Sequence, residues 1–212
     1  MKPRFPGFTL LEVLTVVAVI GVLVALLLPS LAAARAAANR ASTKVRFNEW
    51  AEAIESFRAE YGFYPQFPAG GLVNDGAGAA AADDHPFHDV LAGRRRDGHD
   101  LPEGGSASSA AVQNPRRIRF HTFGAAEFDD SGRLQDAFGN PEIAVLVDAD
   151  LDGVIKVGAD VATLPAVHAA DGAALTPSAA DFPPSGLRAG VVFYSADPRA
   201  SAANPRLILS WK

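Results

Sequence analysis

The sequence predicts an α+β protein in which a long N-terminal helix packs on a small antiparallel β-sheet with long loops. Three observations lead to this prediction. The first is an apolar run from Phe8 to Leu28, in which Glu12 is the only charged residue. The second is an aromatic stripe at helical spacing further along the chain. The third is a set of short apolar segments, bounded by turn residues, in the C-terminal half.

The apolar run is long enough to cross a bilayer as a helix, which needs about 20 apolar residues. A carboxylate such as Glu12 costs roughly 2.5–3.5 kcal/mol at the middle of a membrane, so its presence requires an explanation. Lys2 and Arg4 precede the run in a short segment without acidic residues. By the positive-inside rule, these cations keep the N-terminus cytoplasmic and place the C-terminal bulk on the outer side.

The helix is expected to continue well past the apolar run. Pro29 introduces a possible kink, and an alanine-rich stretch of high helix propensity follows it. Gly62 is a plausible C-cap, so a continuous helix over residues 9–61 would be about 80 Å long at 1.5 Å per residue. One face of its later part carries the aromatic stripe and should bury against the globular domain: Phe47, Trp50, Ile54, Phe57 and Tyr61.

The C-terminal part reads as a sheet with turns and loops. Residues 143–147 and 154–157 are expected to form a β-hairpin around an acidic turn, and residues 191–195 and 207–211 two further paired strands. A short strand is also expected over residues 118–121. The remaining segments read as a short helix around Phe87, Val90 and Leu91, a turn at 136–141, and loops at 69–82 and 158–188.

The acidic turn is the best candidate site in the globular part. Asp148, Asp150, Asp152 and Gly153 match the first half of an EF-hand loop, where alternate carboxylates converge on calcium. The second half does not match, because its twelfth position is Ala159. The alternative is an Asp/Gly turn selected for its backbone geometry alone.

The rest of the sequence gives little indication of metal binding, catalysis or nucleic-acid binding. His85 and His88 lie among three aspartates, where either a metal site or a solvated polar loop is possible, and Pro86 argues against helical presentation of ligands. The arginines at 94–96 read as a solvated turn. The sequence lacks a nucleophile elbow, a P-loop and a zinc-protease motif, so we expect no enzyme. The net charge of −5 gives no indication of nucleic-acid binding, and the absence of cysteine excludes disulfides.

The segment Gly7-Phe8-Thr9-Leu10-Leu11-Glu12 resembles the processing site of the type IV pilin superfamily, which includes the pseudopilins of type II secretion. The resemblance implies cleavage between Gly7 and Phe8, N-methylation of Phe8, and a kink at Pro29. It also implies that Glu12 neutralises the new amine of a neighbouring subunit. The alternatives are a secretory signal peptide cut near residues 32–34, or a plain signal anchor whose Glu12 reaches the membrane interface.

Three further elements resemble major pseudopilins: the turn Tyr61-Gly62-Phe63-Tyr64-Pro65, the Asp136–Pro141 element, and the C-terminal Ser210-Trp211. In that family an acidic loop before the C-terminus binds calcium. The corresponding loop here, residues 197–206, retains one acid, Asp197. A calcium ion is therefore better expected at the acidic turn of residues 148–152.

The resemblance implies an organisation of four parts: a leader at 1–7, a transmembrane assembly helix at 8–30, the outer half of the helix at 31–62, and a globular domain at 63–212. The implied function is that of a pseudopilus subunit in the inner membrane, with a periplasmic domain. The implied partners are further copies, other pseudopilins, prepilin peptidase, the inner-membrane assembly platform and membrane lipid. A minor type IV pilin and a membrane-tethered binding module are the alternatives.

Overall fold

The computed structural model describes residues 9–67, 70–78 and 84–212. The chain divides into two compact units between Asn39 and Arg40. One helix, α1, extends from Leu10 to Tyr61 and contributes to both units. The predicted long helix is therefore confirmed, and each unit is described by itself.

The N-terminal unit consists of the first part of α1 in the described chain. The helix continues through Pro29 without interruption. By length and composition it is able to cross a membrane, and none of its most apolar window is buried within the protein.

In the C-terminal unit, α1 ends as the sequence predicts. Gly62 has a φ of 80°, the left-handed conformation that favours glycine, and its N–H donates to the Arg58 carbonyl at 2.7 Å. Tyr64 and Pro65 then turn into the core and are buried. The turn that resembles the pseudopilin element is thus a helix C-cap followed by two buried side chains.

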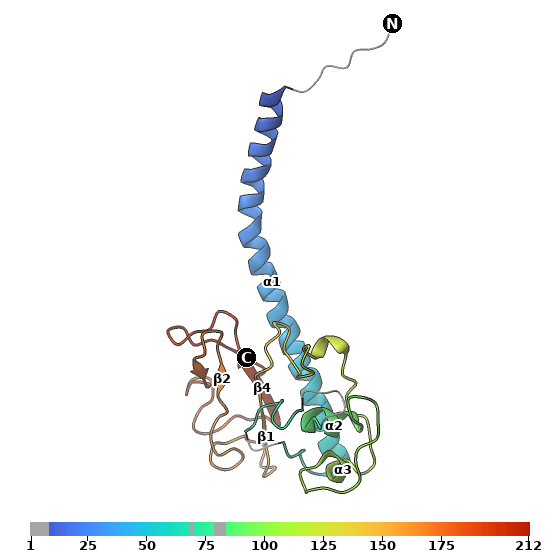
Figure 1. Cartoon of the computed structure of the whole chain (residues 1–212). Coiled ribbons are helices and arrows are strands. Elements are labelled where there is room, and N and C mark those ends of the chain that lie inside the picture. The colour runs from blue at the N-terminus through green and yellow to red at the C-terminus, as the bar shows by residue number, and fades with distance from the viewer. Residues whose placement is uncertain (1–8, 68–69, 79–83) are drawn as a thin grey trace. The chain divides into compact units, whose positions relative to one another are not determined.

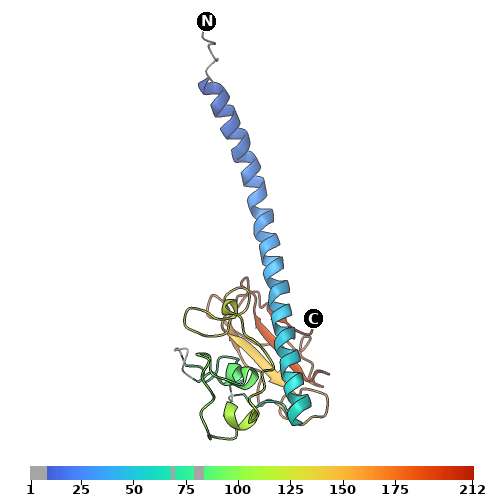
Figure 2. The same cartoon turned by 90° about the vertical axis from the view of Figure 1, so that its right-hand side faces the viewer.

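A three-stranded antiparallel sheet packs along this part of α1 (Figures 1 and 2). Its order is β1 (Ile143–Val147), β4 (Val191–Ala196) and β5 (Leu207–Leu209), with β4 in the centre. The strands at 143–147, 191–195 and near 207–211 are confirmed. Each is rich in β-branched or aromatic residues, which suit a buried pleated surface.

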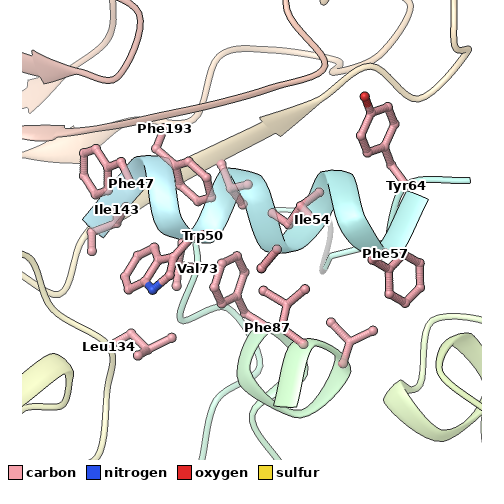
Figure 3. Close-up of a cluster of buried hydrophobic side chains, with 14 of the residues drawn as sticks. Phe47, Trp50, Ile54, Phe57, Tyr64, Val73, Phe87, Leu134, Ile143 and Phe193 are labelled. Atoms are coloured by element: carbon pink, nitrogen blue, oxygen red, sulfur yellow. The ribbon is translucent and has the colours of Figure 1, made fainter. Parts of the chain in front are cut away.

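The aromatic stripe of α1 forms the core between the sheet and helix α2 (Pro86–Ala92), as Figure 3 shows. The side chains of Phe47, Trp50, Ile54 and Phe57 are fully buried. Phe47 stacks on Phe193 of β4 with ring centroids 5.5 Å apart, and Trp50 meets Phe87 of α2 edge-on at 5.4 Å. The stripe predicted from spacing is therefore the central layer of the domain. Tyr61 is partly buried at its end.

The opposite face of the sheet is covered by the segment between β1 and β4. This segment carries a two-stranded sheet, β2 (Val167–His168) and β3 (Ala174–Leu175), where the sequence predicted only loop. The other short elements are α3 (Ala110–Gln113) and a 3-10 turn, η1 (Ala125–Glu127).

Two predicted elements are wrong. The acidic turn does not join a hairpin, because β1 pairs with β4 and Ile155 instead bridges Leu187. Residues 118–121 form no strand. Arg117, immediately before them, has a φ of 52°, outside the extended region, and the N–H groups of Phe120 and His121 both donate to the Leu91 carbonyl.

Candidate functional site: the N-terminal assembly segment

Glu12 lies in the first turn of α1, where it forms a reciprocal cap with Thr9. The Thr9 N–H and hydroxyl both donate to the Glu12 carboxylate at 2.8 Å, and the Glu12 N–H donates to the Thr9 hydroxyl at 3.2 Å. This is the capping-box arrangement, which satisfies backbone donors at a helix N-terminus. The carboxylate is also placed at the positive end of the helix dipole.

Thr9 is a partner of Glu12 that the sequence analysis did not single out. The signal was present, because a threonine three residues before a glutamate and next to an apolar run is the pattern of a capping box. Within a single chain, Thr9 supplies two hydrogen bonds to the Glu12 carboxylate. The cost of a carboxylate in an apolar segment is thereby reduced.

The surface of the N-terminal unit is almost entirely apolar. Its large hydrophobic side chains from Leu10 to Leu28 are at least 46% exposed wherever the structure describes them. An apolar surface of this extent requires cover by lipid or by other protein chains. Glu12 is the only ionisable residue on it within the described residues 9–34.

Three other residues of this segment were predicted to matter for processing or assembly: Gly7, Phe8 and Pro29. Gly7 and Phe8 lie outside the described residues, so cleavage between them and methylation of Phe8 stay predictions. Pro29 lies inside α1, and the Ser30 hydroxyl next to it donates to the Leu27 carbonyl at 2.8 Å.

The acidic turn brings its three carboxylates together. One oxygen from each of Asp148, Asp150 and Asp152 lies within 4.8 Å of the others. Asp148 is buried, and its two oxygens accept from the N–H groups of Asp152 at 3.1 Å and Gly153 at 2.8 Å. Asp152 also contacts the Lys156 ammonium, which lowers the pKa of the Asp152 carboxyl.

This turn fits a cation in part. Calcium takes six to eight oxygen ligands, and the three carboxylates supply a fraction of them. Asp160, close to the twelfth position of the loop, does not face the cluster as a free ligand. Its oxygens accept from the N–H groups of Ala149 at 2.8 Å and Lys156 at 2.7 Å. The hydrogen bonds are sufficient to hold the turn without an ion. The convergence of the three carboxylates is compatible with a bound cation.

The expectation of a solvated loop at His85 and His88 is wrong. Both side chains are buried, as is Asp89. His85 caps α2 by accepting from the His88 N–H at 3.3 Å, and its Nε2 lies 3.2 Å from the Asn74 side-chain oxygen. His88 in turn contacts Asp89 at 2.7 Å.

Burial, followed by the neighbouring His88 and Arg96, lowers the pKa of His85 to about 3. The ring is therefore neutral at ordinary pH, with Nε2 donating and Nδ1 accepting. Asn74 extends this network, because its amide also reaches Leu134 and Pro141. These contacts give the histidines a structural role: they join α2 to the segment that precedes β1.

Comparison with known proteins bears on the N-terminal segment. Residues 3–28 match the model of the prokaryotic N-terminal methylation motif. This motif marks type IV pilin-like prepilin proteins, so the N-terminal segment of the chain is similar to theirs. The matched residues include Gly7, Phe8, Thr9 and Glu12. No curated protein and no solved structure matches the chain.

Together, the methylation motif and the apolar helix indicate anchoring in the inner membrane. They also indicate processing by a prepilin peptidase and assembly with other pilin-like subunits.

Proposed function

We propose that this protein is a structural subunit of a type II secretion pseudopilus. It is inserted in the inner membrane with its N-terminus cytoplasmic, processed between Gly7 and Phe8, and assembled into a helical filament that supports protein export. The observation that carries the proposal is the methylation motif, which is continuous with an exposed apolar helix whose first turn holds Glu12.

The globular domain favours a pseudopilin within the superfamily. Two of the three elements that resemble major pseudopilins, the Asp136–Pro141 element and the C-terminal Ser210-Trp211, contact the central strand, β4. Asp136 accepts from the buried Ser195 hydroxyl at 2.9 Å, and the Ser210 hydroxyl accepts from the Phe193 N–H at 3.0 Å. The Trp211 indole donates to the Asp181 carbonyl at 3.0 Å. Side chains far apart in the sequence thus contact the same sheet, as we expect if these elements belong together in a pseudopilin-like domain.

In this proposal Glu12 has two successive partners. In the separate subunit it accepts from Thr9. In the filament it pairs with the cleaved amine of Phe8 on a neighbouring subunit, which offsets the burial of both charges. The pair forms at one axial offset only, so it also sets the register between subunits.

The test combines processing and assembly. Mass spectrometry of the protein recovered from membranes should give an N-terminus at methylated Phe8, whereas an intact Met1 would contradict the proposal. Glu12→Ala should insert normally, since it removes a charge from the apolar segment, and should reduce filaments about tenfold or more. Glu49→Ala, which removes an exposed carboxylate of α1, is the matched control.

The phenotype then separates the possible systems. Loss of secreted proteins on deletion supports a pseudopilus, and loss of twitching or DNA uptake would instead indicate a type IV pilus subunit. Normal filaments of Glu12→Ala would overturn the pairing of Glu12 while leaving the processing of the chain intact.

A further inference from the structure

The loop between β4 and β5, residues 197–206, is built around one buried carboxylate. Asp197 is 3% exposed, although most of the loop around it is exposed. A carboxylate removed from water is costly unless a cation and hydrogen bonds compensate it. Asp197 therefore requires a positively charged partner from within the protein.

Arg40, on α1, supplies the positive charge. Its Nε and Nη2 both lie 2.6 Å from the Oδ2 atom of Asp197. The second oxygen of Asp197, Oδ1, accepts from the Arg199 N–H at 2.9 Å. Both carboxylate oxygens thus have partners inside the protein.

The backbone of Asp197 connects the two ends of the loop. Its N–H donates to the Arg206 carbonyl at 3.0 Å, and its carbonyl accepts from the Ala200 N–H at 2.8 Å. Because the side chain of the same residue is fixed by Arg40, the contact positions the whole connection between β4 and β5.

The loop does not fit the calcium ion that the resemblance to major pseudopilins implies. Calcium takes six to eight oxygen ligands, usually with several carboxylates. Asp197 is the only acid among residues 197–206, which also contain two arginines. A cavity of about 380 Å³ beside the loop has two carboxylates among its described lining residues, Asp197 and Asp181. Asp181 is already paired with the Lys212 ammonium at 2.6 Å.

We infer that the Arg40 guanidinium compensates the charge of Asp197 and holds this loop in place, the role that a bound calcium ion would otherwise have. The planar guanidinium suits a carboxylate better than a lysine ammonium would, because it presents two donors in a fixed fork. The loop consequently folds without calcium. This inference goes beyond the proposed function, since it holds for the folded domain whichever filament the protein joins.

Hydrogen–deuterium exchange of the full chain in detergent micelles tests the inference. In the wild-type protein, peptides from residues 197–206 should exchange at the same rate in EDTA and in millimolar calcium. Arg40→Gln leaves Asp197 buried and uncompensated, and should raise the exchange rate of this loop about tenfold or more. Arg35→Gln, which removes an exposed arginine earlier on α1, should leave the loop unchanged.

A double variant separates the charge effect from lost packing. Arg40→Gln with Asp197→Asn removes both charges, so its loop should exchange more slowly than that of Arg40→Gln alone. It also serves as the measurement if Arg40→Gln fails to fold. Equal exchange of Arg40→Gln and Arg35→Gln would overturn the inference. Loss of protection in EDTA, or gain of protection with calcium, in the wild-type loop would overturn it as well.

Discussion

The neutral, buried His85 makes the stability of the globular domain depend on pH. The pKa of this histidine is about 3 in the folded protein, against a reference of 6.5. Below pH 6.5 the unfolded chain therefore binds a proton that the folded chain does not, and stability falls as the pH falls. The slope approaches about 1.4 kcal/mol per pH unit, so the loss between pH 6.5 and 5.5 is about 1 kcal/mol.

The surroundings of His85 explain why it resists protonation. Burial is the main cause of the lowered pKa, the neighbouring His88 and Arg96 oppose a further positive charge, and Nδ1 already accepts from the His88 N–H at 3.3 Å. The Asp89 carboxylate accepts from the backbone N–H of His85 at 3.3 Å and contacts His88 Nδ1 at 2.7 Å, so it is already engaged. A proton on Nδ1 would thus break the cap of α2 and add a charge in the core.

Urea unfolding of the full chain in micelles, followed by the fluorescence of Trp50 and Trp211 at pH 7.5, 6.5 and 5.5, measures the effect. His85→Asn is the informative variant, because asparagine also caps helices and does not titrate. It should be less stable than the wild type at pH 7.5, with a flatter pH dependence. His99→Asn, at a side chain 81% exposed, controls for loss of a histidine. Parallel pH curves for the wild type and His85→Asn would refute the argument.

Two further predictions concern the terminal cap and the acidic turn. Thr9→Val removes the capping hydroxyl, at about 0.5–2 kcal/mol, so the first-turn amides of α1 should exchange faster in micelles, whereas Thr9→Ser should retain protection. We also propose that calcium, where it binds, occupies Asp148, Asp150 and Asp152, with an affinity in the range of about 10⁻⁴–10⁻³ M. Millimolar calcium should then slow exchange over residues 148–156 in the wild type and not in Asp150→Asn; no change in the wild type would rule the site out.

The parts of the fold that sequence predicted correctly are those whose information is local. The spacing of Phe47, Trp50, Ile54 and Phe57 defines a helical face without reference to any partner, and the structure buries all four. Gly62 likewise ends α1 through its own backbone conformation. The strand at 143–147 was recognisable because its side chains are apolar and bounded by turns.

The wrong elements depended on contacts across the chain. A hairpin at 143–157 was the nearest pairing in sequence, but β1 found its partner in β4, where Val145 lies opposite Phe193. The polar composition around His85 suggested solvent, whereas Asn74 supplies a hydrogen-bond partner that permits burial. Neither outcome is encoded in the segment itself.

The difference between local information and long-range contacts also applies to the two candidate sites. At the N-terminus, the proposed cleavage site and Glu12 are a few residues apart in one continuous segment, so the pattern that predicts them is visible in the sequence. Even the missed partner, Thr9, is three residues away. In the loop of residues 197–206, composition alone showed that carboxylates for calcium were too few. The cation that compensates Asp197 comes from Arg40, 157 residues earlier, and only the folded domain brings the two together.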